Sequence, residues 1–157
     1  MKLISSDLIN QTIDNAREFE RKRSVYRFHE RDEDKVQRML NAIEPQSYVA
    51  PHKHEDPDKV EVFIGLLGKL LALEFDDQGK LINHQVFGPS QETRGVEFAP
   101  RAWHCVWSLE ERSVAYEVIE GPYNDNDHKH FAAFAPKEEE KERAQSYMLE
   151  IKKSLGL

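Results

Sequence analysis

Three histidines and one glutamate in this sequence have the types and spacing of a metal-ligand set. His52 and His54 are two residues apart, so on an extended strand their side chains point to the same face. Glu61 opens the apolar run "EVFIGLLG", where a buried carboxylate is costly unless it is paired or coordinates a cation. His104 lies in "PRAWHCVW", a segment composed like a core strand. Three nitrogen ligands and one oxygen ligand suit one divalent transition metal (Mn, Fe, Co, Ni or Zn) better than Ca or Mg.

Each of these residues also has a plainer interpretation. His52 and His54 could be exposed polar residues beside a loop. Glu61 could be the last exposed residue before the strand is buried, or a partner of Lys59. His104 could be a core histidine that is hydrogen-bonded to the backbone. The metal site is therefore a hypothesis that depends on all four residues lying together.

Strand parity separates His104 from the neighbouring cysteine. If His104 faces the interior, Val106 and Ser108 face it too, whereas Cys105 faces the other way and is not expected to be a ligand. Cys105 is the single cysteine of the chain, which excludes an internal disulfide and is typical of a reducing compartment.

The remaining histidines fall in polar segments. His128 and His130 form "HKH" in a segment rich in Asn and Asp, which indicates a surface loop or a second site. We expect His84 at the solvent-facing tip of a hairpin. His29 lies in a polar connector and could line a cavity.

The elements that would position the ligands alternate in the manner of an all-β domain. Residues 6–21 have helical apolar spacing, with Ser6 or Asp7 as the cap. "VQRMLNAI" fits either two helical turns or a strand, "DDQG" predicts a hairpin turn, and the last segment predicts an amphipathic helix. We expect a single domain over residues 1–157, with an N-terminal helix at about 1–22, a small β-barrel or jelly roll at about 36–122 and a C-terminal helix at about 137–155.

Composition narrows the class of protein. Apolar residues make up 39% of the chain and charged residues 32%, as in a globular domain. The net charge of −7 argues against a nucleic-acid partner. The basic run at 17–27 is interleaved with glutamates and predicts a solvated helix face. No apolar run approaches the roughly 20 residues of a membrane helix, and "MKLISSDLINQTIDN" has no apolar leader region, so we expect a cytoplasmic protein without a membrane partner.

The ligand pattern resembles the cupin superfamily. Its first motif, a His-x-His followed by a Glu and then a Gly, is matched by His52, His54, Glu61 and Gly68, with a longer gap before Glu61. Its second motif is matched by Gly95, Pro100 and His104, whereas the usual asparagine is absent and Ser108 stands nearby.

Over residues 20–137 the chain further resembles the WbuC family of cupin-fold metalloproteins. The resemblance lies in "VQRMLNAIEPQSYVAPHKH", "EFDDQGKL", "AWH", "YEVIEGPY" and "FAAFAP", in that order. It implies that "VQRMLNAI" is a strand. It also implies a connection with bacterial cell-surface polysaccharides, and hence with a sugar or a sugar nucleotide.

These observations predict a metal-dependent enzyme that acts on a small polar substrate, most simply by isomerising, epimerising or modifying a sugar. Arg38 and Tyr48 are the candidate substrate contacts: Tyr48 has the strand parity of His52 and His54, and Arg38 could hold an anion. A non-catalytic metal- or ligand-binding module is the alternative. A homodimer is compatible with the apolar faces of the terminal helices.

Overall fold

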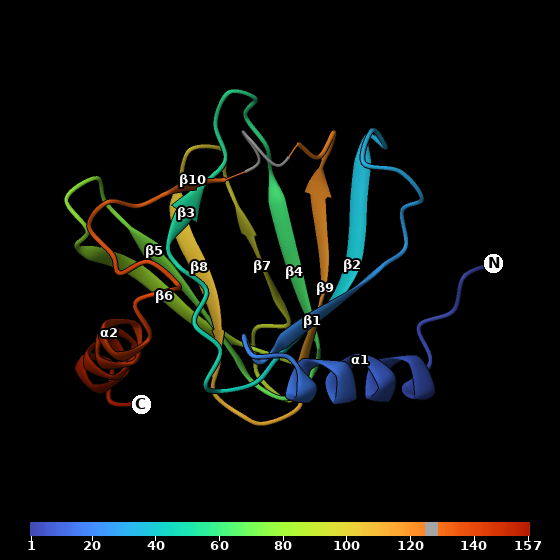
Figure 1. Ribbon diagram of the computed structural model, residues 1–157, viewed down its shortest axis with the longest axis horizontal. Coiled ribbons are helices and arrows are strands. Elements are labelled where there is room, and N and C mark those ends of the chain that lie inside the picture. Colours follow the sequence, from blue (N-terminus) through green and yellow to red (C-terminus); the bar gives the residue numbers. More distant parts are fainter. Residues whose placement is uncertain (125–128) are drawn as a thin grey trace.

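The chain folds into two antiparallel five-stranded sheets that face each other, with one helix against each sheet (Figure 1). The computed structural model describes residues 1–124 and 129–157. The strand orders are β1-β2-β9-β4-β7 and β10-β3-β8-β5-β6. The elements are α1 (Ser6–Glu18), β1 (Arg23–Arg27), β2 (Val36–Ile43), β3 (His52–Lys53), β4 (Glu61–Leu67), β5 (Leu70–Phe75), β6 (Leu81–Phe87), β7 (Gly95–Phe98), β8 (Trp103–Ser108), β9 (Ser113–Glu120), β10 (His130–Phe131) and α2 (Lys141–Ser154).

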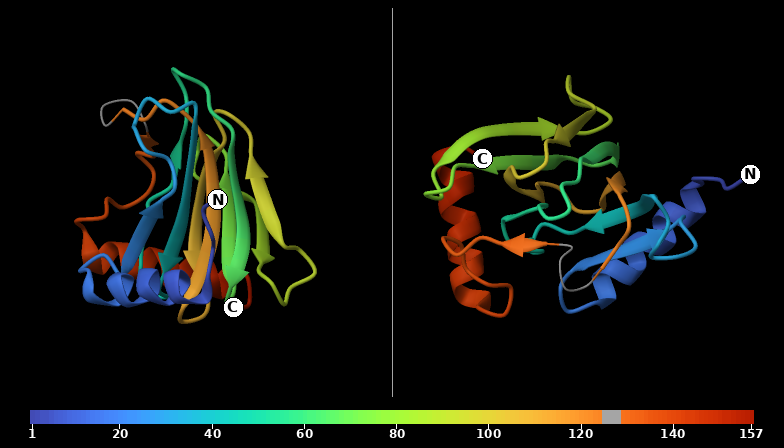
Figure 2. Two further views of the ribbon diagram at one scale, coloured as in Figure 1. Left: turned by 90° about the vertical axis from the view of Figure 1, so that its right-hand side faces the viewer. Right: turned by 90° about the horizontal axis from the view of Figure 1, so that it is seen from above.

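This architecture confirms the predicted cupin-type jelly roll with a helix at each end. It differs from a closed β-barrel, because the two sheets are not joined to each other at their edges. Strands β1 and β10 end their sheets on one side and β7 and β6 on the other, and no ladder joins the sheets within the described residues. The sheets are held together by side chains, and the view from above in Figure 2 shows them as separate layers.

Apolar side chains fill the space between the sheets and also cover the outer face of the second one. The inter-sheet core draws on strands of both sheets, including Phe63 of β4 and Val106 of β8. On the other face of β8, Cys105 and Trp107 pack against Met148 of α2. Strand β8 is buried on both faces, which explains its continuous apolar sequence and confirms the parity predicted around His104.

Helix α1 covers the outer face of the first sheet. Ile13 and Ala16 are fully buried and pack against β2 and β9. The helix is capped by Ser5 rather than by Ser6 or Asp7, and the Ser5 hydroxyl oxygen accepts a hydrogen bond from a first-turn amide at 3.2 Å.

The basic run at 17–27 is not a solvated helix face, as the sequence had suggested. The helix ends at Glu18, and from Arg23 the chain forms β1, whose backbone pairs with the edge of β2. Arg17 itself donates from Nε to the buried carboxylate of Glu44 at 2.8 Å. The pairing of β1 with β2 and the ion pair of Arg17 with Glu44 therefore determine the structure of this segment, and its charge pattern does not.

Other local predictions have mixed outcomes. Residues 36–43 form strand β2, as the family resemblance implies, and the predicted turn places Gly79 at φ +81°. His84 is exposed, as predicted, but it lies within β6 and not at the hairpin tip. Neither of the helices among the described residues is long and apolar enough to cross a membrane.

Candidate metal centre

The four predicted ligands meet between the two sheets. One potential ligand atom from each residue can be chosen so that all lie within 4.8 Å of one another, and every one of the four side chains is buried. His52 of β3 is directly paired with His104 of β8, and His54 follows β3. Glu61 comes from β4 of the opposite sheet. The cluster therefore depends on the two sheets facing each other.

Backbone carbonyls orient two of the imidazoles. Nδ1 of His52 donates to the Ala50 carbonyl at 2.9 Å, and Nδ1 of His104 donates to the Ala102 carbonyl at 2.8 Å. With the ring proton on Nδ1, the lone pair of Nε2 faces the cluster in both residues. Metal-binding histidines are typically oriented by such a second hydrogen bond.

The Nε2 atoms of His52 and His104 are not placed as a metal-free cluster would need. Nε2 of His52 is buried without a hydrogen-bond partner among the described residues. Nε2 of His104 lies 2.7 Å from Oε2 of Glu61, and Nε2 of His54 lies 3.3 Å from the same oxygen. A lone pair at 2.7 Å from a carboxylate oxygen is repulsive unless a proton or a cation lies between them. These residues therefore fit a metal ion.

Burial and hydrogen bonding favour the protonation states that a metal requires. Burial lowers the pKa of His52 well below its ordinary value, so this imidazole is neutral. Burial acts to raise the pKa of Glu61, but the close polar contacts of its carboxylate with the ring nitrogens of His104 and His54 outweigh burial and hold that pKa well below 4.5. Neutral imidazoles and an ionised carboxylate are the ligand forms of these side chains.

A fifth polar residue, Glu117, lies beside the cluster and was missed by the sequence analysis. It sits in the middle of β9 with 7% of its surface exposed, and Nδ2 of Asn41 donates to its Oε2 at 2.7 Å. Burial, and next the negative charge of Glu61, raise the pKa of Glu117 to about 8. The available signal was an acidic residue with the same strand parity as Ala115 and Ile119.

A cavity of about 380 Å³ lies near the cluster, although none of the four ligands is part of its lining. Asn41 and Glu117 form part of its wall, and Phe131 of β10 forms part of its rim. The Phe131 ring lies 6.1 Å, centroid to centroid, from the ring of His52. The buried cluster thus has room beside it for a small molecule.

The model of the family described as "Domain of unknown function (DUF6016)" matches residues 4–87, more than half of the chain. The chain belongs to this family. The DUF6016 match includes His52, His54 and Glu61 and ends before β8, which carries His104. No curated protein matches the sequence.

Several solved structures are similar to this DUF6016 protein in their fold. The capsular polysaccharide assembling protein CapF from Staphylococcus aureus is 17% identical with a TM-score of 0.57, over 69% of this chain and 29% of CapF. An L-ribose isomerase from Cellulomonas parahominis is 11% identical with a TM-score of 0.55, over 71% of this chain and 69% of the isomerase. KdgF from Halomonas sp. is 12% identical with a TM-score of 0.50, over 66% of this chain and 82% of KdgF. These neighbours have the cupin fold, and at such identities the likeness shows the fold alone.

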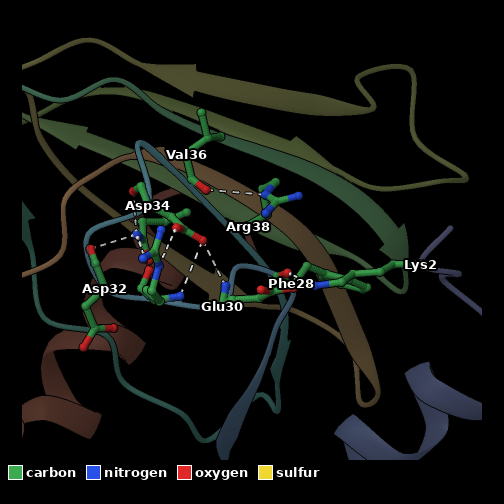
Figure 3. A network of polar contacts seen from close by, with 9 residues as sticks. Lys2, Phe28, Glu30, Asp32, Asp34, Val36 and Arg38 are labelled. Carbon is green, nitrogen blue, oxygen red and sulfur yellow. Dashed lines mark hydrogen bonds and ion pairs between the residues drawn. The ribbon is translucent and has the colours of Figure 1, made fainter.

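Neither predicted substrate contact reaches the cluster in this DUF6016 protein. Arg38 alternates with the cavity-lining residues Gln37 and Met39 along β2, so it faces away from the cavity. Its Nε donates to the Val36 carbonyl at 3.4 Å (Figure 3).

Tyr48 lies on the outer side of the second sheet. Its hydroxyl donates to the Pro136 carbonyl at 2.8 Å, and its ring packs near Trp107. The chain between β2 and β3 is not a strand, so the assumed parity of Tyr48 with His52 does not hold. A cavity of about 540 Å³ next to Tyr48 lies against α2. Like the 380 Å³ cavity it is lined by none of the four ligands, and unlike that cavity its lining includes neither Glu117 nor Phe131.

The other histidines also lie outside the cluster. His130 is on β10 beside β3, and its Nε2 lies 3.0 Å from the Glu55 carbonyl, so the prediction of a surface loop is wrong for it. His128 lies outside the described residues. His29 is buried and lines the 380 Å³ cavity, as the sequence had suggested.

Proposed function

We propose that this protein is a metal-dependent enzyme that acts on a small polar substrate. One observation carries the proposal: a buried His₃Glu cluster, with the Nε2 of His52 unpartnered, lies next to a cavity of about 380 Å³. A purely structural cluster would need no such space beside it. Sites of this kind, with a few convergent polar groups in a concavity, are the usual places for small-molecule chemistry.

His52, His54, Glu61 and His104 would hold one divalent transition metal, drawn from Mn, Fe, Co, Ni and Zn. When bound, such an ion supplies a Lewis acid that polarises a carbonyl or hydroxyl oxygen. The chain supplies the rest of the site. The Ala50 and Ala102 carbonyls fix the imidazoles of His52 and His104, and the two sheets exclude water from the cluster.

A sugar or a sugar nucleotide linked to cell-surface polysaccharide synthesis is the substrate class we favour. The WbuC resemblance motivates this choice, and so do two neighbours whose names concern capsular polysaccharide assembly and L-ribose isomerisation. Isomerisation or epimerisation is the simplest reaction of this kind. A homodimer and a cytoplasmic location stay predictions from the sequence.

The alternative is a non-catalytic module that binds a metal or a small ligand. The near-complete burial of the ligands favours it, because His52 is 3% exposed and Glu61 1%. In that case the ion would serve to join the two sheets. Turnover of a sugar would then be absent even with the metal bound.

Elemental analysis of protein purified without chelator tests the metal site. We expect close to one equivalent of a transition metal, which the double variant His52→Ala, His104→Ala loses. The exposed residue His84 supplies a matched control, and His84→Ala should retain the metal. Nuclear magnetic resonance of aldose and ketose mixtures with the loaded protein then separates the enzyme from the binding module. If wild type and double variant both lack metal, the site assignment is wrong.

A further inference from the structure

The wall of the 380 Å³ cavity carries a hydrogen-bond acceptor without a partner. Nδ2 of Asn41 donates to Oε2 of Glu117, which fixes the orientation of the Asn41 amide. The Oδ1 atom of Asn41 is then buried and has no partner within the described part of the chain. A buried acceptor left unpaired is destabilising, and the native structures that contain one usually reserve it for water or a ligand.

Glu117 places a second acceptor beside Asn41. The two residues lie on neighbouring strands, β2 and β9, and both line the cavity. Adjacent amide and carboxyl oxygens on one wall match the hydroxyl groups of a polyol, because each hydroxyl offers one donor and a carboxyl group keeps an acceptor oxygen in either protonation state.

His29 adds an imidazole to the same cavity. Its Nδ1 lies 3.0 Å from the backbone nitrogen of Arg38 and 3.1 Å from the carbonyl oxygen of the same residue, so the backbone of Arg38 holds the ring in place. The ring is buried and lines the cavity. The lining therefore offers acceptors and an imidazole to a ligand that carries several hydroxyl groups.

The charge of the cavity lining is opposite to that of the whole chain. Among the described residues, four Lys and Arg side chains line the cavity against two carboxylates, although the chain has a net charge of −7. Arg23 is paired with Glu138, and Arg27 with Asp32.

Lys129 differs from these arginines, because it makes no ion pair with any residue that the structure describes. Its ammonium is close enough to the cluster for its charge to act on both His52 and Glu61. Within the described part of the chain Lys129 is in no ion pair, and a cation that lines a cavity next to a metal centre is suited to an anionic ligand.

We propose that this cavity binds a small hydroxylated anion, with the anionic group at Lys129 and the hydroxyl groups at Asn41 and Glu117. A sugar acid and a sugar phosphate share this chemistry. The inference rests on the proposed function, since it names the substrate class of the same site. It differs from that proposal in requiring a negative charge on the ligand.

Isothermal titration of the full chain with three probes tests the inference. D-glucuronate, glucose 6-phosphate and glucose have the same ring, but only the first two are anions. We expect at least one anion to bind roughly tenfold more tightly than glucose, as expected for one partly desolvated charge pair. Preference for glucuronate would identify a carboxylate ligand, and preference for glucose 6-phosphate a phosphate. Equal affinity for all three, or no binding of either anion, would overturn the inference.

Two variants and a control locate the contacts. Lys129→Gln should remove the preference for anions and leave glucose affinity unchanged, whereas Asn41→Ala should weaken all three probes. Lys80→Gln, at an exposed lysine of the β5–β6 turn, should match wild type. Circular dichroism establishes that each variant is folded. Wild-type behaviour of Lys129→Gln would refute the assignment of the anion site.

Titrations with and without metal keep the two proposals apart. Anion preference in protein that never takes up metal would refute the proposed enzyme and support the cavity assignment. Stoichiometric metal with no anion preference would support the proposed metal enzyme and refute the cavity assignment.

Discussion

Nε2 of His104 lies 2.7 Å from Oε2 of Glu61, although the two side chains come from different sheets. Phe98 explains how this contact is held. It is paired with Glu61 across β4 and β7, and its ring stacks on the His104 imidazole at 4.2 Å and 16°. The ligand geometry is therefore supported by apolar packing as well as by the polar contact.

Glu61→Gln should abolish tight metal binding while the protein stays folded. The substitution keeps the shape of the side chain but removes the negative charge and one good ligand oxygen. Loss of groups that only support a ligand costs about 10–100-fold in metal affinity, so we expect a loss of at least about 100-fold here. Competition against a chromophoric chelator measures the affinity.

Glu97→Gln is the control for this experiment, because Glu97 is an exposed carboxylate on β7, across the ladder from Val62. It should bind metal like wild type. An affinity of Glu61→Gln equal to that of Glu97→Gln would show that Glu61 is not a ligand.

The metal cluster could be predicted from the sequence because its signals are local. His52 and His54 share a face through strand parity, and Glu61 and His104 stand out as polar residues in apolar strands. The same parity argument failed for Tyr48, because the chain before β3 leaves the extended conformation. Alternation predicts a face only where a continuous ladder enforces it.

The cavity wall could not be predicted in the same way. Asn41 and Glu117 are 76 residues apart in sequence and meet only through the pairing of β2 with β9. Both lie in segments whose polar and apolar residues alternate as in any strand, so neither residue stands out in the sequence. The order of strands within a sheet, which no local pattern encodes, brings such residues together.

Glu117 should make the stability of the metal-free protein depend on pH. Its pKa is raised from 4.5 to about 8 in the folded chain, so above pH 4.5 the folded state keeps a proton that the unfolded chain releases. The contribution of Glu117 to stability therefore falls as the pH rises through this window. Glu117→Gln lacks this effect and should gain stability relative to wild type by on the order of 3 kcal/mol between about pH 5 and pH 8.

Urea unfolding of both proteins, stripped of metal and compared at these two pH values, measures the difference. Groups that do not interact with Glu117 titrate equally in both proteins and cancel. Parallel pH profiles for wild type and Glu117→Gln would show that the pKa of Glu117 is not raised.

Gly68→Ala should be clearly destabilising. Gly68 has φ +70°, and an added Cβ would lie 2.4 Å from Oγ and 2.8 Å from Cα of Ser113. Gly156 provides a matched control, since it has φ +73° with open space around it. Left-handed backbone alone costs about 1 kcal/mol for alanine, and overpacking adds about 1–3 kcal/mol. Urea unfolding should therefore show a larger loss for Gly68→Ala, and equal losses would mean that the contact with Ser113 relaxes freely.

Met148→Ala should detach part of α2 from the second sheet. Met148 is 2% exposed and belongs to the cluster of Tyr48 and Trp107, so truncation leaves a cavity and should cost about 2–5 kcal/mol of unfolding free energy. The neighbouring Leu149 is 53% exposed, and Leu149→Ala should change stability by less than about 0.5 kcal/mol. Chemical unfolding followed by the fluorescence of Trp103 and Trp107 measures these losses. A loss for Leu149→Ala as large as that for Met148→Ala would indicate that Leu149 is covered in solution, as the homodimer prediction would allow.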